Sequence, residues 1–121
     1  MRAESTGFGY VVIDGKRYGH DVVLTDEVRP RRKELSKSLR SRFGHTPLTG
    51  EEILAYFRDY RPEVIVVGTG QFGALPLVGV DEAARELGAE LIAKRTGEAL
   101  KEYNRLVKEG RRVGALFHVT C

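Results

Sequence analysis

The sequence of 121 residues predicts a single α/β domain, residues 1–121, built around a parallel βαβαβ unit. Two observations lead to this prediction. Over the C-terminal half, short apolar runs alternate with helix-patterned segments across short joints, which favours right-handed crossovers and parallel strands. Apolar residues make up 41% of the chain and charged residues 31%, a composition typical of a folded globular protein.

A β-hairpin is expected near the N-terminus. Residues 8–13 alternate, are rich in Val, Ile and Tyr, and run into Asp14-Gly15. An Asp-Gly pair between two such runs indicates a type I′ turn, because that turn needs positive φ at both central residues. The return strand is predicted over residues 16–24. A further extended segment is expected over residues 28–32, where Pro30 favours an edge strand or irregular backbone.

A helix start is predicted at Thr49. Thr49 and Glu52 have the spacing of a capping box, and Leu48 and Ile53 have the spacing of a hydrophobic staple. The helix is expected to end before Pro62, because a proline disfavours helical backbone at the residue that precedes it.

The rest of the chain has the pattern strand, helix, strand, helix, strand. A wholly apolar run predicts a strand covered on both faces, and apolar residues at helical spacing that stop at a glycine predict a capped helix. In chain order the pattern predicts a strand over 64–67, a helix from Val80 to Leu87 that stops at Gly88, a strand over 89–93, a helix capped by Thr96 and closed by Gly110, and a strand over 113–119.

Three segments are expected to meet at one edge of the sheet. Parallel strands all end at the same edge, and ligands of open α/β sheets bind there, so residues 68–73, 94–96 and 118–121 should converge. They contribute glycines, two cationic side chains, hydroxyls, a histidine and a thiol, a chemistry that suits a small anion. The candidate ligand-binding residues are Gly68, Thr69, Gly70, Gln71, Arg95, Thr96, Asn104, His118 and Thr120.

The loop Gly68–Gly73 matches the G-x-G-x-x-G pattern of dinucleotide sites. In such a site a helix begins within the loop and points its N-terminus at the pyrophosphate. Pro76 and Gly79 forbid a helix that runs on from the third glycine, and Lys94 and Arg95 stand where the acidic ribose ligand is expected. No cofactor is therefore predicted. A small-anion nest and a glycine turn that only reverses the chain both stay open.

Plainer structural roles compete with binding at several candidates. Thr96 can act only as a helix cap, Lys94 and Arg95 can be solvated charges, and His118 can be a buried histidine with satisfied hydrogen bonds. Asn104 lies inside a predicted helix, where asparagine is a poor helix former. A hydrogen bond to a neighbouring loop and plain exposure are equally open for its side chain.

No catalytic or metal-binding group is predicted. His118 and Cys121 suggest a base and a nucleophile, but side chains alternate along a strand, so these two point to opposite faces while His118 and Thr120 share one. His20, His45 and His118 are scattered and lack metal-ligand spacing. These observations favour a protein that is not an enzyme.

The basic charge of the chain is local. Residues 28–42 hold seven Lys or Arg and one Glu, a net charge of +6, whereas the remainder carries −3. The basic segment 29–42 has no aromatic residue on which a base could stack, so nucleic-acid binding is less favoured than a surface or oligomer contact. Leu35 and Leu39 predict a short helix in it with a thin apolar edge.

Composition also bears on location. The one cysteine excludes an internal disulfide, which favours a reducing cytoplasm. No apolar run approaches the roughly 18 residues of a membrane helix, and the N-terminus has no apolar stretch of a signal peptide. Asn and Gln each occur once while Lys, Arg and Glu are abundant, a bias typical of thermophile proteins.

The order of these motifs resembles a small family of largely uncharacterised archaeal and bacterial α/β proteins. Its eukaryotic relatives include a mitochondrial complex I assembly factor and an adipogenesis-associated protein. The matching features are Phe8-Gly9, Asp14-Gly15 and Asp21-Val22-Val23; His45 with Leu48-Thr49 and Glu52; Pro62-Glu63 with Gly68-Thr69-Gly70; Thr96, Ala99 and Tyr103-Asn104; and Gly110-Arg111-Arg112-Val113 with His118-Val119-Thr120-Cys121. The resemblance implies a three-layer α/β fold with a mixed sheet, and it brings no established reaction or cofactor.

Three functional hypotheses follow. The favoured one is a non-catalytic binding or assembly-type module with a small-anion site at the carboxyl edge of the parallel strands. The second is an enzyme or ligand-regulated protein that acts on a small anionic metabolite or nucleotide at the Gly68–Gly73 loop. The third is nucleic-acid binding through residues 29–42. The first hypothesis implies a protein partner or a homo-oligomer. None of the three hypotheses involves a membrane.

Overall fold

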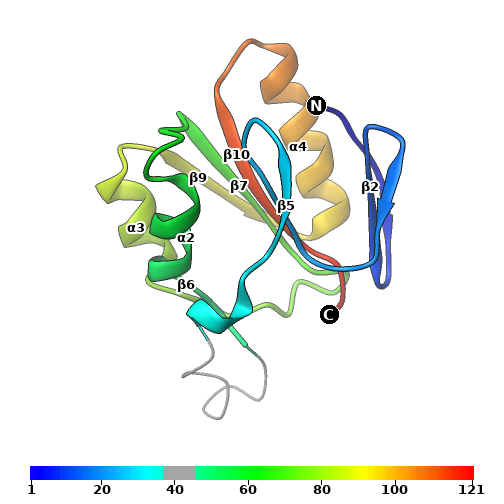
Figure 1. The fold of residues 1–121 in the computed structure, drawn as a ribbon, viewed down its shortest axis with the longest axis horizontal. Coiled ribbons are helices and arrows are strands. Elements are labelled where there is room, and N and C mark those ends of the chain that lie inside the picture. Colours follow the sequence, from blue (N-terminus) through cyan, green and yellow to red (C-terminus); the bar gives the residue numbers. More distant parts are fainter. Residues whose placement is uncertain (37–45) are drawn as a thin grey trace.

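A mixed sheet forms the centre of the molecule. A computed structural model describes residues 1–36 and 46–121, and within them the central sheet has the order β5-β4-β10-β7-β9 (Figure 1). Its strands are β4 (Val22–Leu24), β5 (Val28–Pro30), β7 (Val64–Thr69), β9 (Glu90–Lys94) and β10 (Val113–His118). β10, β7 and β9 pair in parallel, whereas β4 is antiparallel to β10 and β5 to β4. The predicted α/β fold with a mixed sheet and a parallel βαβαβ unit is confirmed.

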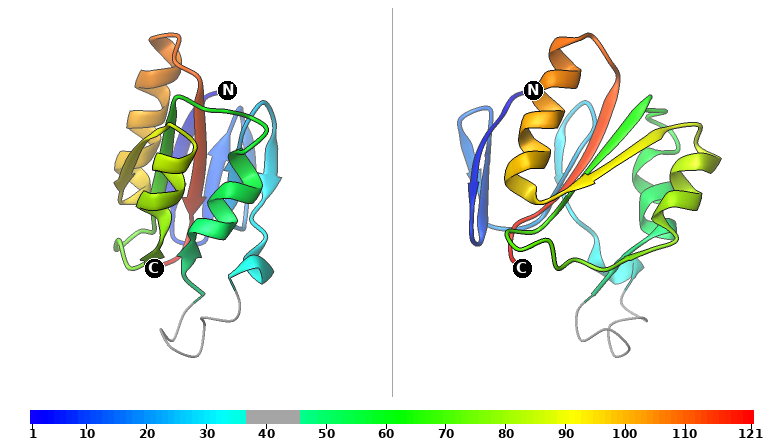
Figure 2. Two further views of the ribbon diagram at one scale, coloured as in Figure 1. Left: turned by 90° about the vertical axis from the view of Figure 1, so that its left-hand side faces the viewer. Right: turned by 180° about the vertical axis from the view of Figure 1, so that it is seen from behind.

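Helices cover both faces of this sheet (Figure 2). α4 (Thr96–Lys108) packs on one face, and α2 (Gly50–Phe57) and α3 (Val80–Glu86) pack on the other. The alternation of side chains along β7 divides the core accordingly, with Val64 and Val66 facing α4 and Ile65 and Val67 facing α2 and α3. These layers are the three that the resemblance implied.

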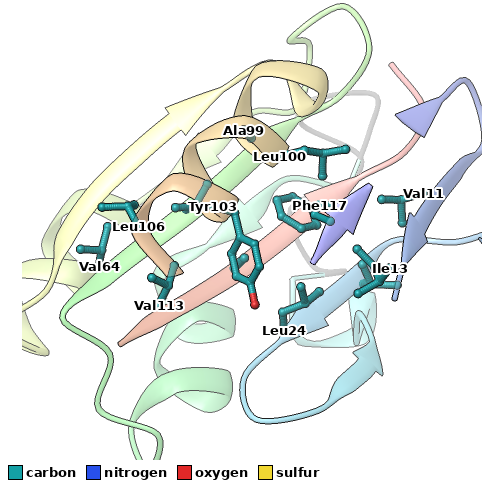
Figure 3. Close-up of a cluster of buried hydrophobic side chains, with 14 of the residues drawn as sticks. Val11, Ile13, Leu24, Val64, Ala99, Leu100, Tyr103, Leu106, Val113 and Phe117 are labelled. Carbon is teal, nitrogen blue, oxygen red and sulfur yellow. The ribbon is translucent and has the colours of Figure 1, made fainter. Parts of the chain in front are cut away.

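The core beneath α4 includes an aromatic pair. The rings of Tyr103 and Phe117 meet edge to face with centroids 5.8 Å apart (Figure 3). Val11 and Ile13 of a separate, N-terminal sheet close the same cluster from the side. The N-terminal hairpin is therefore part of the main core.

That N-terminal sheet contains β1 (Ala3–Gly7), β2 (Tyr10–Ile13) and β3 (Lys16–Tyr18) in antiparallel order. Asp14 has φ 50° and Gly15 has φ 78°, as the predicted type I′ turn requires. No local pattern predicts β1, whose residues after the buried Ala3 are mostly polar and at least partly exposed.

The return strand predicted over residues 16–24 is wrong as a single strand. β3 ends at Tyr18 and β4 begins at Val22, in a different sheet. The three residues between them carry the chain from one sheet to the other. The last of the three, Asp21, turns its carboxylate toward the end of β10 and accepts a hydrogen bond from the Val119 amide at 2.9 Å.

The start of α2 matches the prediction in part. The Thr49 hydroxyl accepts a hydrogen bond from the Glu52 amide at 3.2 Å, as a helix cap does. The predicted capping box is wrong in its second half, because the Glu52 carboxylate bonds to Arg31 instead of to the backbone of Thr49. Thr49 also belongs to β6 (Leu48–Thr49), which pairs in parallel with β8 (Leu77–Val78).

The basic segment has more than one environment. β5 is an edge strand, as Pro30 predicted, and a 3₁₀-helix, η1 (Lys33–Leu35), follows it. Arg31 is buried and ion-paired, so it is not part of an exposed basic surface. Several residues of this part of the chain lie outside the described ranges: Lys37, Leu39, Arg40, Arg42 and His45. In the described ranges, no helix is long and apolar enough to span a bilayer.

Candidate functional site

The ends of the three parallel strands meet, as the topology predicted. The Gln71 amide donates to the Thr120 carbonyl at 2.7 Å, which joins the loop after β7 to the segment after β10. The Thr69 hydroxyl donates to the Lys94 carbonyl at 3.1 Å, which joins the same loop to the end of β9. Segments 68–73, 94–96 and 118–121 therefore form one continuous edge.

Thr96 links all three strand ends through one hydroxyl. Its Oγ1 accepts from the Gly70 amide at 2.9 Å and donates to the His118 carbonyl at 2.6 Å, and its side chain is fully buried. The prediction that Thr96 caps α4 is wrong, because Arg95 is the N-cap residue and no side chain caps the helix. A Cβ at Gly68 would lie 2.8 Å from this hydroxyl, so the approach of Thr96 requires glycine there.

The glycine loop uses its backbone donors within the chain. The amides of Phe72 and Ala74 both donate to the Cys121 carbonyl oxygen, at 3.1 and 2.9 Å. Gly70 has φ +106°, and a Cβ on it would overlap the backbone of Cys121. The loop therefore wraps the chain's own segment after β10, and an anion at this edge would be held by side chains.

Buried charges lie directly behind the edge. Asp21 accepts from the His118 ring nitrogen Nδ1 at 2.7 Å and from Arg31 Nη1 at 3.1 Å, and its side chain is 3% exposed. Burial by itself would raise the pKa of the Asp21 carboxyl. The hydrogen bonds from His118 and Val119 and the charge of Arg31 outweigh that effect and hold this pKa below its ordinary value.

Arg31 connects Asp21 to a second buried carboxylate. Its guanidinium forks onto Glu52, with Nε 2.7 Å from Oε2 and Nη2 3.1 Å from Oε1, and Nη2 also donates to the Pro47 carbonyl. Glu52 accepts two further hydrogen bonds at 2.6 Å, from the hydroxyls of Ser36 and Tyr56. Burial, together with the hydrogen bond to Glu52 and the charge of that carboxylate, raises the pKa of Tyr56 above its ordinary value. We call Asp21, Arg31, Glu52, Ser36 and Tyr56 the buried polar network.

His118 lies between this network and the surface. Its Nδ1 faces the Asp21 carboxylate, which fixes Nδ1 as the donor, and its Nε2 lies 3.2 Å from the Thr120 hydroxyl. The His118 side chain is 12% exposed, and Thr120 is partly exposed. Thr69 is the register partner of His118 on β7, so its side chain projects from the same face of the sheet.

Arg95 borders the same edge. Its Cγ would lie 3.3 Å from a Cβ placed on Gly73, so the side chain runs along the glycine loop. Lys94 and Arg95 are both exposed, and neither has an ion-pair partner in the described part of the chain. Arg95 is therefore a cation available to a ligand beside the loop, whereas Lys94 pairs in register with Gly68 and its charge acts on Glu102 of α4.

Asn104 is the one candidate that the structure does not bring to the edge. Its amide clamps the backbone of Ala3, with Oδ1 accepting from the Ala3 amide at 2.9 Å and Nδ2 donating to the Ala3 carbonyl at 2.6 Å. Asn104 therefore joins α4 to β1. Of the two alternatives for this side chain, the structure shows hydrogen bonding to a neighbouring segment, here a strand.

An exposed aromatic pair lies beside the edge. Phe8 and Phe72 are 61% and 67% exposed, and their ring centroids are 6.3 Å apart. The turn between β1 and β2 is joined to the segment after β10 by a hydrogen bond from the Gly9 amide to the Val119 carbonyl, and β1 is joined to the glycine loop by one from Gln71 Nε2 to the Thr6 hydroxyl. The pair is apolar surface that the fold leaves open to solvent.

A separate groove of about 840 Å³ lies alongside α2 and β5. Its lining mixes three arginines with three acidic residues and two tyrosines: Arg29, Arg32, Arg112, Asp26, Glu27, Asp59, Tyr56 and Tyr60, with Val23, Thr25, Pro30 and Ala55. Tyr56 belongs both to this lining and to the buried polar network. Among the described residues, no group of three His, Cys, Asp or Glu side chains is placed to hold a metal ion.

The sequence did not single out Asp21, Arg31 or Tyr56 as site residues, and it assigned Glu52 to a helix cap. One signal was present. Asp21 directly precedes the apolar run Val22–Leu24, and a charged residue at the start of a buried strand needs a partner. That partner could not be identified from spacing, because His118 lies 97 positions away.

Known proteins share this fold and sequence pattern. Residues 3–118 match the model of a family described as a protein of unknown function (DUF498/DUF598). The structure is similar to that of the conserved hypothetical protein PH1505 from Pyrococcus horikoshii OT3, with 36% identity, a TM-score of 0.82 and 100% of both chains covered. It is also similar to a protein called MT938, with 34% identity, a TM-score of 0.81 and 99% and 98% of the two chains covered.

A more distant similarity concerns the fold alone. A protein from Bordetella pertussis, described as a Mth938-like domain and solved by NMR in solution, has 21% identity and a TM-score of 0.60. The match covers 98% of this chain and 85% of that one.

Proposed function

The chain belongs to the DUF498/DUF598 family of proteins of unknown function, and from this premise we propose that it is a binding module for a small anionic ligand. The site is the carboxyl edge of β7, β9 and β10. The observation that carries the proposal is the exposed side chain of Arg95, which runs along the glycine loop and has no ion-pair partner among the described residues. His118 lies at the same edge, with its Nδ1 held by buried Asp21 and its Nε2 facing the partly exposed Thr120 hydroxyl.

The charges at the edge favour an anion. Arg95 is an exposed cation whose side chain runs along the glycine loop, and Thr69 and Thr120 add hydroxyls. The amides of Phe72 and Ala74 are already bonded to Cys121, so the edge offers side chains and not a backbone cradle for a pyrophosphate. This arrangement supports a single phosphate or carboxylate group over a dinucleotide.

A thermal-shift screen with inorganic phosphate, sulfate and small dicarboxylates tests the proposal. An anion at about 100 times its Kd should stabilise the fold by about 2.7 kcal/mol. In Arg95→Gln the Kd should rise about tenfold or more, because a charge-assisted hydrogen bond contributes roughly 1.5–3 kcal/mol. Arg85→Gln, an exposed arginine on α3, is the matched control and should leave the shift unchanged. The proposal fails if no anion stabilises the protein or if both variants respond alike.

The exposed aromatic pair favours a second candidate, an assembly-type module that contacts another protein. Phe8 and Phe72 form one apolar spot at the junction of the hairpin and the glycine loop. A second copy of this chain is the simplest partner for it. Sedimentation velocity should then show self-association that Phe8→Ser/Phe72→Ser abolishes and that Leu77→Ser, a change at an exposed apolar residue on β8, preserves. A monomeric wild-type chain would exclude this partner.

A further inference from the structure

We propose that the same edge catalyses acyl transfer, with Thr120 as nucleophile and His118 as general base. Asp21, His118 and Thr120 form a hydrogen-bonded series of carboxylate, imidazole and hydroxyl. A hydroxyl nucleophile is activated in this order, since the carboxylate orients the ring and the ring accepts the hydroxyl proton. The substrate class is a small carboxylic ester that carries an anionic group, and this choice of class rests on the proposed anion site.

The distances suit these roles. Asp21 Oδ2 lies 2.7 Å from Nδ1, so the ring presents Nε2 as the acceptor to Thr120 Oγ1 at 3.2 Å. Asp21 is itself held rigidly, because its other oxygen accepts from the Val119 amide and its Oδ2 also meets Arg31. Asp21 is a positioning residue, whereas His118 and Thr120 are the groups that would touch the reacting atoms.

Backbone donors are available next to the nucleophile. The amides of Thr120 and Cys121 make no hydrogen bond to any described part of the chain. The amide of a nucleophilic residue commonly contributes to the site that stabilises the oxyanion of the tetrahedral intermediate. The Thr120 carbonyl accepts from the Gln71 amide, which anchors this segment against the loop.

The chemistry needs only water as a second reactant. Thr120 Oγ1 bonds to the ester carbonyl carbon and passes its proton to His118 Nε2. The bond to the alcohol oxygen then breaks, and the alcohol leaves with that proton. Water attacks the threonyl ester with His118 again as base, the carboxylic acid departs, and Thr120 recovers its hydroxyl proton.

A fluorophosphonate probe tests the nucleophile without knowledge of the substrate. Thr120 Oγ1 would displace fluoride from phosphorus, with its proton passing to His118, and leave a stable phosphonyl adduct. Intact mass and peptide mapping should show one adduct, on Thr120, in the wild-type protein. In His118→Gln the labelling rate should fall about 100-fold or more, which is the range lost with a general base. An unlabelled wild-type chain, or equal rates in His118→Gln, overturns the inference.

Matched variants separate nucleophilicity from folding. Thr120→Val should take no label, whereas Thr120→Ser keeps a hydroxyl and should label at least as fast as wild type. Thr25→Val is the control. It removes a partly exposed hydroxyl whose hydrogen-bond partner is the Asp26 carboxylate, 3.2 Å away, and not a histidine. Thr120 should be labelled in this variant at the wild-type rate. If Thr120→Ser folds but is not labelled, the hydroxyl is only a structural partner of His118 and the inference fails.

Two ester substrates distinguish this inference from the binding proposal. 4-Nitrophenyl hemisuccinate carries an anionic group and 4-nitrophenyl butyrate does not. In one outcome, Thr120 is required for hydrolysis of both esters, the charged ester is not preferred, and Arg95→Gln has no effect on the rate. This result would uphold Thr120 as the nucleophile and overturn the anion site. Anion binding that depends on Arg95, with no adduct and no turnover, would uphold the binding module and overturn catalysis.

Discussion

At the scale of single residues, two buried side chains, a hydroxyl and a carboxylate, form hydrogen bonds to distant residues that their local sequence does not indicate. Thr96 has the sequence position of a helix cap, yet its Oγ1 bonds to Gly70 and His118, which are 26 and 22 positions away. Glu52 has the position of a capping-box partner, yet its carboxylate bonds to Arg31. The local patterns located the starts of α4 and α2 but assigned the wrong contacts to both side chains. Their contacts could not be predicted, because the partners are brought together only by the tertiary fold.

Thr96→Val should destabilise the protein by about 2–6 kcal/mol. The substitution keeps the shape of the side chain but leaves the Gly70 amide and the His118 carbonyl without a partner, at about 1–3 kcal/mol for each buried group. Urea unfolding followed by circular dichroism measures the difference. Thr96→Ser keeps the hydroxyl and should lose clearly less. Equal losses in the two variants would show that the methyl group, and not the hydrogen bonds, stabilises this junction.

At the scale of elements, α4 is joined to β1 by one side chain. Asn104→Ala removes both hydrogen bonds to the Ala3 backbone and should cost about 1–3 kcal/mol. Hydrogen exchange at the Ala3 amide should accelerate, while exchange at the amides of β7 should change only with global stability. Asn104→Asp keeps the acceptor for the Ala3 amide and should protect that amide better than alanine does. Unchanged exchange at Ala3 in Asn104→Ala would contradict the role of this clamp.

The contact between β10 and α2 requires a glycine at position 114. A Cβ at Gly114 would lie 2.7 Å from two ring atoms of Phe57, so Gly114→Ala should overpack this contact and cost about 1–3 kcal/mol. In the background of Phe57→Leu, the same change should cost less, because the smaller side chain leaves room for the methyl group. The free energies of unfolding of wild type, the two single variants and the double variant give the coupling energy between the two positions. Strict additivity would mean that the cost of the added methyl group does not come from the Phe57 ring.

Elements with a local signal were predicted, and elements without one were not. The hairpin turn has Asp14-Gly15, and β7 has a continuous apolar run, so both were found close to their observed bounds. β1, with its polar residues, and the short pair β6 and β8 exist only because a neighbouring backbone is in place to bond them. The parallel topology also predicted the convergence at the strand ends, since parallel strands must finish together.

At the scale of the whole molecule, the buried polar network joins segments that are distant in sequence. Asp21 precedes β4, Arg31 follows β5 and Glu52 lies in α2, and the network contacts His118 at the end of β10. The removal of one partner from such a network leaves the others buried without compensation, which costs about 3–5 kcal/mol. The network therefore couples the candidate site to the stability of the entire fold.

Acid should weaken the fold through Asp21. The pKa of this carboxyl is lowered from its ordinary value in the folded protein, so in acid the unfolded chain binds more protons and stability falls as the pH falls. The contribution of Asp21 is complete above the unfolded pKa and is lost as the pH drops through the folded one. Near pH 6 the free energy of unfolding of Asp21→Asn should therefore be lower than that of wild type by at least about 3 kcal/mol. This difference should narrow towards pH 2.

Urea unfolding of wild type and Asp21→Asn at several pH values between 6 and 2 measures this gap. Glu102→Gln is the control, since Glu102 is paired with Arg105 at the surface. The free energy of unfolding of this variant should stay close to that of the wild type over the same pH range. A gap between wild type and Asp21→Asn that stays constant down to pH 2 would contradict the prediction. It would mean that the charge on Asp21 does not supply the stability that its geometry indicates, and that the contacts of His118 and Arg31 are equally good with a neutral side chain.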